Sequence, residues 1–378
     1  MFGPVRLFFA LREHPDLGVL AAVVSVSALF AATPFIIPAV AVEYDVSIGR
    51  AGLLSAAQVG GFAVATFVAG RTLRTHRRYL IGGASAAVAL NLISAAVPTF
   101  ETLLATRVLA GAAAGVLVWL AWSNAVRTEG ALRNVAAAGP LTVLIATPIL
   151  AWISTNSGAS AMYVAIAVLA IPAVFLPAEF AGYRRDRSHV SPSRSNVVLV
   201  IALGMVTLAG SALFVYGAAI GVSIGLSAFV VSLAYSGSAL AGLIATRIRT
   251  DDQPGSVWIF GIAACAALVA FSDSSLLFLI GITLWGFCFW MATPTLLRSI
   301  AAWSLAPDER VGDAQSSMAV GRALGPAVGS FLVVDAAYTT VGAFTVVGLV
   351  ITGCIVLGVR IYRRDRQPPT RRLPSVAG

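Results

Sequence analysis

Long apolar runs, separated by short polar connections, fill almost the whole chain. A helix needs about 20 residues to cross the hydrocarbon of a bilayer, and twelve runs approach that length. The expected spans are 17–42, 51–70, 79–97, 103–126, 134–154, 160–177, 196–220, 226–246, 256–272, 275–297, 314–334 and 338–357. The pattern therefore predicts an all-α membrane protein with twelve transmembrane helices.

One extended polar connection, at 178–195, interrupts this pattern near the middle of the chain. It predicts a six-helix bundle at 1–177, a cytoplasmic linker at 178–195, a second six-helix bundle at 196–360 and a tail at 361–378. The tetrapeptide Val-Ser-Ile-Gly occurs at 46–49 and again at 222–225, and Gly61 matches Gly237 at the same spacing. A two-fold repeat in a membrane chain is typical of transporters, so we expect two pseudo-symmetric bundles.

Composition and charge place most of the chain in lipid. Charged residues make up 11% of the sequence, against about 25% in a soluble domain, and hydrophobic residues make up 58%. The basic residues behind the net charge of +9 are all arginines, and they gather in alternate connections. Arginine excess marks the cytoplasmic side. We therefore expect a multi-pass protein of the cytoplasmic (inner) membrane, with both termini in the cytoplasm and no nucleic-acid partner.

Twelve spans in two halves around a central linker resemble the major facilitator superfamily, and local motifs support the resemblance. The basic positions of the family's loop between spans 2 and 3 are matched by Arg74, Arg77 and Arg78. Leu73 stands at the acidic position of that loop. In span 4, Arg107 followed by Gly111 resembles the family's Arg-x-x-Gln-Gly pattern, and Arg322 lies in a glycine-rich stretch similar to the family's span 11.

The resemblance implies a secondary active transporter that moves a small organic molecule by alternating access, and not an enzyme. Pro34 and Pro38 in span 1 resemble the drug-efflux branch, which implies proton-coupled export of amphipathic compounds by a monomer surrounded by membrane lipids. The alternative is uptake of a small organic anion recognised by Arg107. A membrane-embedded enzyme or a receptor is the competing class, and ligand binding without flux would favour the receptor.

In the family's fold, spans 1, 4, 7 and 10 line a central cavity, so their side chains bear on the substrate. The expected cavity residues are Arg107, Phe30, Thr33, Phe214, Tyr216, Trp285, Phe289 and Trp290. This aromatic, nearly uncharged set suits an apolar or amphipathic ligand better than a sugar, which needs many hydrogen-bonding side chains. The competing interpretation is that many of these residues face lipid or neighbouring helices.

A second group of residues is expected to act in gating or coupling: Arg74, Arg77, Arg78, Arg322 and Glu43. Snorkelling, or an ion pair with Glu43 or Glu101, is the simpler interpretation of Arg107. For Arg322 the favoured interpretation is a structural pair with Asp308, Glu309 or Asp313. The predicted helix-packing residues are Gly111, Gly115, Gly321, Gly325 and Gly329, because small residues let helix backbones approach closely in lipid.

Cofactor and metal chemistry finds no support in the sequence. The three cysteines lie in apolar runs without metal-ligand spacing, and no Gly-Lys-Ser/Thr phosphate loop occurs. We therefore predict no cofactor and no metal site, with a small molecule as substrate and the proton as the coupling ion.

Overall fold

The computed structural model describes residues 16–125, 129–180, 193–245, 247–248, 254–305, 307–334 and 337–364. Within these ranges the chain is helical and has no strand, which confirms the all-α fold. The helices are α2 (Leu17–Glu43), α3 (Ile48–Thr72), α4 (Arg77–Ala96), α5 (Phe100–Ala125), α6 (Glu129–Phe175), α7 (Arg194–Phe214), α8 (Gly217–Ser223), α9 (Ala228–Ala245), α10 (Gly255–Phe271), α11 (Ser275–Ala302), α12 (Pro307–Leu332) and α13 (Thr339–Arg364).

These helices supply the predicted spans with two changes. The fifth and sixth spans join without a loop in α6, where Gly158 alone leaves the helical conformation, at φ 76° and ψ −174°. The seventh span is divided into α7 and α8 by a turn at Val215 and Tyr216. Among the described residues, nine segments are long and apolar enough to cross a membrane. Two helices are not among them: α10 is shorter, with 17 residues, and α12 is long enough at 26 residues but more polar.

The last helix runs further than the hydrophobic pattern predicts. Arg363, assigned above to a polar tail, lies inside α13 and is only 6% exposed. Its guanidinium donates to Asn196 Oδ1 at 2.7 Å and to the Ser299 carbonyl at 3.2 Å, and it lies 4.9 Å above the Trp303 ring. A long arginine side chain that finds partners on α7 and α11 extends the helix past its apolar part. Residues 365–378 of the predicted tail and 181–192 of the predicted linker lie outside the described residues.

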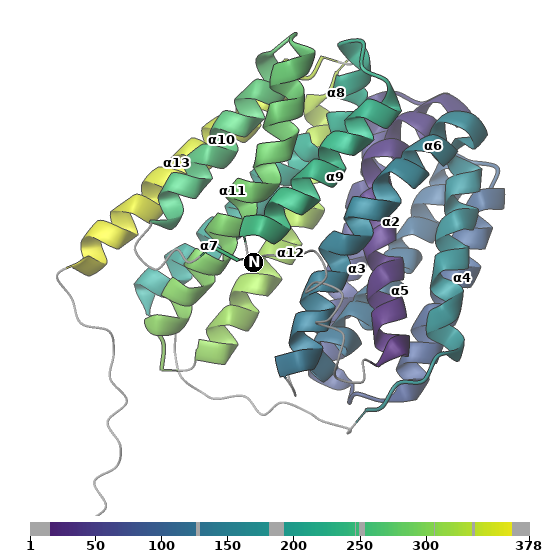
Figure 1. Ribbon diagram of the computed structural model, residues 1–378, viewed down its shortest axis with the longest axis horizontal. Helices are drawn as coiled ribbons and strands as arrows, with labels where there is room; N and C mark the ends of the chain where they lie inside the picture. Colours follow the sequence, from purple (N-terminus) through teal and green to yellow (C-terminus); the bar gives the residue numbers. More distant parts are fainter. Residues whose placement is uncertain are drawn as a thin grey trace, which may run out of the picture.

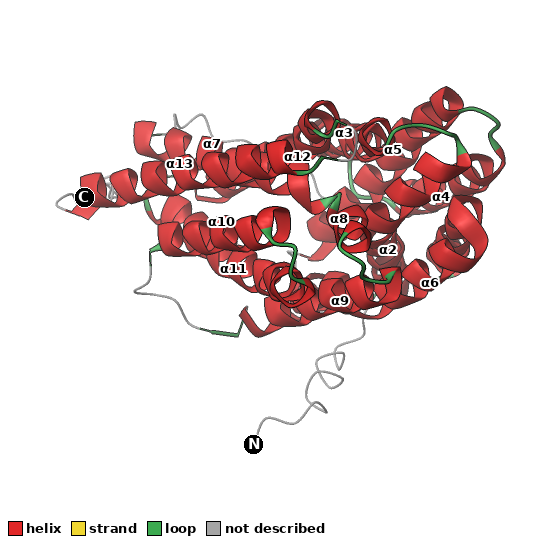
Figure 2. Ribbon diagram, turned by 90° about the horizontal axis from the view of Figure 1, so that it is seen from above, coloured by secondary structure: helices red, strands yellow, loops and turns green. Residues whose placement is uncertain are grey.

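The helix contacts repeat between the two halves of the chain (Figures 1 and 2). In the first half α2 packs on α6, and α3 packs on α5; in the second half α7 packs on α12, and α9 packs on α11. Two larger contacts join the halves, α3 with α12 and α6 with α9, and Figure 2 shows them on opposite sides of the molecule. The centre of the molecule therefore lies between these two contacts, with helices of both halves around it.

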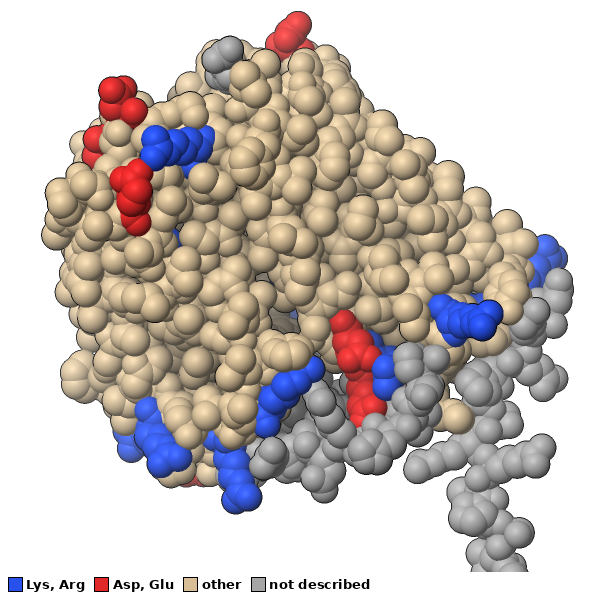
Figure 3. Space-filling model, turned by 180° about the vertical axis from the view of Figure 1, so that it is seen from behind, with Lys and Arg blue, Asp and Glu red and all other residues tan. Residues whose placement is uncertain are grey.

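Charge distinguishes the two ends of the helices (Figure 3). One end, which we call the acidic face, carries Glu43, Asp45, Arg50, Glu101 and Asp273. The other end, the arginine-rich face, carries Arg71, Arg74, Arg77, Arg78, Arg298 and Arg310. Figure 3 shows the surface hollowed between the halves beside the arginines of the second face.

Candidate functional site: a central cavity closed at the acidic face

Four aromatic rings from four helices meet between the halves. Tyr235 of α9 packs against Phe35 of α2, with ring centroids 5.7 Å apart, and against Phe214 of α7 at 4.9 Å. Phe214 in turn lies 5.3 Å from Trp285 of α11. The Tyr235 hydroxyl donates to the Phe214 carbonyl at 2.7 Å, which fixes the ring. We call this cluster the aromatic roof, because it fills the centre of the molecule with side chains from both halves.

A tight seam closes the acidic face beyond the roof. The Tyr216 hydroxyl donates to the Gly49 carbonyl of α3 at 3.4 Å. A Cβ atom on Gly49 would lie 2.5 Å from the Val333 carbonyl oxygen, and one on Gly52 would lie 1.9 Å from the Tyr216 hydroxyl. Because no side chain fits at these positions, Gly49 lies directly against the backbone of the other half, and Gly52 lies directly against the Tyr216 ring. We call this contact the acidic-face seam.

On the opposite side of the roof, Arg322 is reached by solvent. It follows Gly321, where an added Cβ atom would lie 2.1 Å from the Gly204 carbonyl oxygen. Gly204 is the midpoint of α7, so Arg322 stands at mid-depth in the bundle. Its guanidinium lies 5.9 Å above the Phe289 ring. Phe289 is one helical turn from Trp285, toward the arginine-rich face. Arg322 is nevertheless exposed, and Figure 3 shows the surface hollowed between the halves on this side of the molecule.

The other predicted cavity residues contact several different helices. Phe30 packs edge-on against Phe62 of α3 at 5.3 Å. Thr33 donates to the Leu29 carbonyl of its own helix at 3.4 Å. Trp290 packs on α9, where a Cβ atom on Gly242 would lie 2.4 Å from its ring. Tyr216 is fully buried in the acidic-face seam and therefore closes the cavity instead of lining it.

Arg107, predicted to line the cavity, lies inside the first half instead. It is 1% exposed, and it donates to Asn91 Oδ1 at 3.0 Å, to the Leu90 carbonyl at 3.2 Å and to the Ser94 hydroxyl. Its guanidinium stands 4.5 Å from the Tyr163 ring. All these partners are neutral and belong to α4 and α6. The helix turns this side chain away from the space between the halves, and neither Glu43 nor Glu101 pairs with it among the described contacts.

The residues predicted to act in gating separate into three places. Glu43 accepts hydrogen bonds from the Ala159 backbone N–H at 3.1 Å and the Ser160 hydroxyl at 2.7 Å. It thereby caps the helix that begins after Gly158, where a negative charge is favourable. The exposed arginines of the turn between α3 and α4 are Arg74, Arg77 and Arg78.

Arg322 does not make the pair with Glu309 or Asp313 that the sequence favoured. Arg310 forms ion pairs with both carboxylates: its guanidinium nitrogens lie 2.5 Å from a carboxylate oxygen of Asp313 and 3.2 Å from one of Glu309. The side chain of Asp308 lies outside the described residues. Arg322 therefore has no ion pair with either of these two carboxylates.

The five predicted packing glycines lie at close backbone contacts within each half. A Cβ atom on Gly111 would lie 1.9 Å from the Gln58 carbonyl, and one on Gly115 would lie 2.4 Å from the Phe62 carbonyl. On α12, added Cβ atoms would meet α7 backbone oxygens at 2.1 Å for Gly321, 2.4 Å for Gly325 and 2.6 Å for Gly329.

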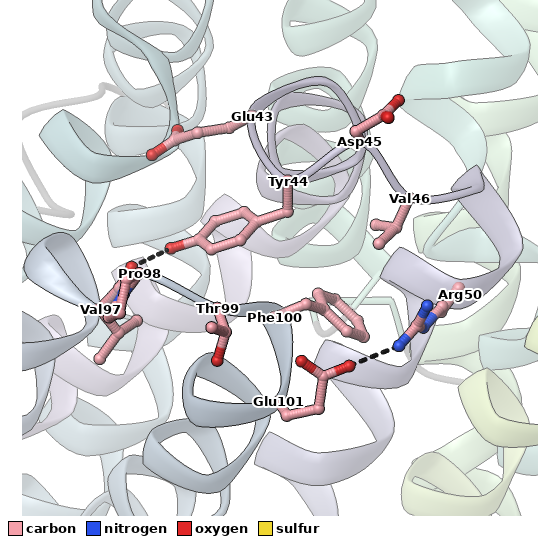
Figure 4. A pocket seen from close by; sticks show the side chains of 10 residues that line it. All are labelled: Glu43, Tyr44, Asp45, Val46, Arg50, Val97, Pro98, Thr99, Phe100 and Glu101. Atoms are coloured by element: carbon pink, nitrogen blue, oxygen red, sulfur yellow. Dashed lines mark hydrogen bonds and ion pairs between the residues drawn. The ribbon is translucent and has the colours of Figure 1, made fainter.

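A pocket that the sequence did not indicate opens on the acidic face (Figure 4). It has a volume of 610 Å³ and lies between the loops that follow α2 and α4. The Tyr44 hydroxyl donates to the Val97 carbonyl at 2.9 Å, and Arg50 pairs with Glu101 at 2.5 Å. Partial burial and the neighbouring Glu43 carboxylate raise the pKa of Tyr44. The pocket belongs to the first half alone and has no connection with the roof residues.

Metal ligands do not gather anywhere in the described part of the chain: no group of three His, Cys, Asp or Glu side chains is placed to hold an ion.

The fold matches solved membrane transporters over nearly their whole length. No protein-family model matches the sequence, and no curated protein matches it. A bacterial homologue of the human lysosomal transporter Spinster, solved in an inward-facing and occupied conformation, aligns with a TM-score of 0.71 over 98% of this chain and 100% of that chain, at 13% identity. A POT family transporter in complex with 5-aminolevulinic acid gives 0.70, covering 94% and 97%, at 12% identity. The nucleoside transporter NupG gives 0.69, covering 91% and 99%, at 11% identity. At these identities the likeness establishes a shared fold, which is that of membrane transporters.

Proposed function

We propose that the chain is a secondary active transporter that works by alternating access between its two halves. The observation that carries this proposal is the asymmetry of the central space. The aromatic roof and the acidic-face seam close it at one end, whereas Arg322 is exposed and the surface is hollowed between the halves at the other. A pathway closed at one face and open at the other is the arrangement that alternating access requires. The fold shared with transporters, and the resemblance to the major facilitator superfamily, support the same function.

The lining favours a small organic substrate with an apolar body. Phe214, Trp285 and Phe289 present aromatic rings at the roof and just beneath it. Such a surface suits amphipathic compounds. We therefore propose export of an amphipathic molecule, with protons as the coupling ion.

The charge asymmetry supports an orientation. Arginine-rich connections face the cytoplasm in most membrane proteins. We propose that the protein lies in the cytoplasmic membrane as a monomer, with its arginine-rich face, and with it the open end of the cavity, toward the cytoplasm. The exposed arginines of this face also suit contact with anionic lipid headgroups.

Uptake of a small organic anion through Arg107 is the alternative. The guanidinium of Arg107 is enclosed by Asn91, Ser94 and Tyr163, so no observation favours a substrate there.

Transport by purified protein in liposomes tests the proposal. A fluorescent amphipathic dye is loaded inside, a pH gradient of either sign is imposed, and dye movement is followed with and without a protonophore. Protein-free liposomes give the leak rate. We expect gradient-dependent dye movement that the protonophore abolishes. Dye binding without movement under any gradient would instead establish a receptor and overturn the proposed function.

A further inference from the structure

Arg322 is a positive charge at mid-depth with no carboxylate partner among the described residues. Its level is fixed by Gly321, which meets Gly204 halfway along α7, and by Phe289, which lies halfway along α11. The nearby carboxylates Glu309 and Asp313 are held by Arg310. An ionised side chain at this depth is costly unless it faces water or an anionic group, and such residues mark substrate and ion pathways.

The position of Arg322 beneath the roof separates it from lipid. Phe289 and Trp285 lie four residues apart on one face of α11, and Trp285 packs into the roof against Phe214. The guanidinium above Phe289 therefore lies on the inner side of α11, next to the space between the halves.

The contact with Phe289 leaves the donors of Arg322 available. A distance of 5.9 Å to the ring centroid is at the outer limit of a cation–π contact, and no hydrogen bond holds the guanidinium in the described part of the structure. A guanidinium presents a planar fork of donors that matches an oxyanion bidentately. The ring beside it offers a surface for an apolar group.

We infer that Arg322 and Phe289 form the substrate-recognition site, and that the substrate is an organic oxyanion with an apolar or aromatic body. Arg322 pairs with the carboxylate, sulfonate or phosphate of the substrate, and its apolar body packs against Phe289 below Trp285. This inference rests on the proposed function and names its substrate class. It moves recognition from Arg107, which neutral side chains already surround, to the arginine that solvent reaches.

Binding measurements test the site without requiring transport. The probes are 2-naphthoate and its neutral analogue 2-naphthamide, and binding is followed by calorimetry and by ligand-induced thermal stabilisation of the detergent-solubilised protein. The variants are Arg322→Gln, Arg322→Lys and the matched control Arg50→Gln, which removes the same charge at an exposed position of the acidic face.

We expect 2-naphthoate to bind the wild type and Arg50→Gln equally and to bind Arg322→Gln about 10- to 100-fold more weakly, the range for a lost hydrogen bond to a charged group. Arg322→Lys keeps the charge but loses the fork, so its affinity falls between the two. The weak binding of 2-naphthamide is expected to be the same in all four proteins. Arg322→Gln should melt no lower than the wild type without ligand, because it removes an unpaired charge.

Three outcomes would overturn the inference: no binding of 2-naphthoate by the wild type, unchanged binding by Arg322→Gln, or an equal loss of 2-naphthamide binding. The liposome assay separates this failure from that of the proposed function. If the dye is transported but 2-naphthoate binding does not depend on Arg322, the recognition site is refuted and the transporter function stands. If 2-naphthoate binding depends on Arg322 but no dye is transported, the transporter function is refuted.

Discussion

The acidic-face seam gives the most direct test of alternating access, through Gly52→Trp. A Cβ atom at Gly52 would lie 1.9 Å from the hydroxyl and 2.6 Å from the Cζ atom of Tyr216. Tyr216 is fully buried and is backed by α12, where an added Cβ atom on Gly329 would lie 2.9 Å from its ring. The ring therefore cannot swing aside to admit an indole.

The cost of the substitution falls on the closed seam alone. Overpacking a well-filled contact costs about 1–3 kcal/mol even for a few added methylene groups. A conformation in which the acidic-face seam is open has no such clash. A penalty of about 2 kcal/mol on the closed conformation therefore shifts the equilibrium between closed and open seams about 30-fold toward the open one. Gly60→Trp is the matched control, because it places the same side chain on α3 where no atom lies within 4 Å of the new Cβ position.

Labelling of a single cysteine measures the shift. Phe289→Cys in a background without the three native cysteines reports on the space beneath the roof, and a membrane-impermeant maleimide is applied from the acidic face. We expect the labelling rate to rise at least tenfold in Gly52→Trp and to stay unchanged in Gly60→Trp. Equal rates in the two folded variants would refute the reasoning, since the seam would then not control access.

Three further predictions concern stability and driving force. Asn91→Leu removes the side-chain oxygen that accepts from Arg107 and should lower the unfolding free energy by about 1–3 kcal/mol. Tyr163→Phe removes a hydroxyl without a hydrogen-bond partner and should leave the melting temperature unchanged; a larger loss for Tyr163→Phe than for Asn91→Leu in thermal denaturation would contradict this network. Ser236→Ala removes a hydrogen bond of 2.9 Å to the Leu144 carbonyl across the halves and should lower stability by about 0.5–1.5 kcal/mol, measured in the same way. If the substrate is an anion, a potassium diffusion potential that makes the arginine-rich side negative should drive 2-naphthoate toward the acidic face with about 2.3 kcal/mol per 100 mV, and it should not drive 2-naphthamide; equal fluxes would exclude a charged substrate.

The hydrophobic pattern predicted the helices because membrane thickness dictates their length. Apolar runs of about 20 residues needed no knowledge of their neighbours to be identified as spans. The boundaries depend on partners that the pattern does not contain. Arg363 lies within α13 because Asn196 and Ser299 are within reach of its side chain. The fifth and sixth spans form one element, α6, because the break between them is confined to a single residue, Gly158.

The roles of the two intramembrane arginines depend on helix rotation, which the sequence does not specify. Both lie in small-residue stretches, and both are expected to be costly in lipid. Rotation of α5 directs Arg107 to Asn91 and Tyr163, whereas rotation of α12 directs Arg322 to Phe289 and to solvent. A polar Asn91 in span 3 was the available signal that Arg107 would find its partners inside the half.

Close glycine contacts occur in two settings, and the difference bears on how the molecule moves. Within the halves, Gly111 and Gly321 bring backbones together along mid-depth stretches of helix, where no water competes and separation would expose polar groups to lipid. Between the halves, Gly49 and Gly52 make contacts of the same closeness near the acidic face, where water can hydrate the separated surfaces. The proposed rocking of two bundles about a central substrate therefore requires that the contacts at Gly49 and Gly52 part while those at Gly111 and Gly321 hold.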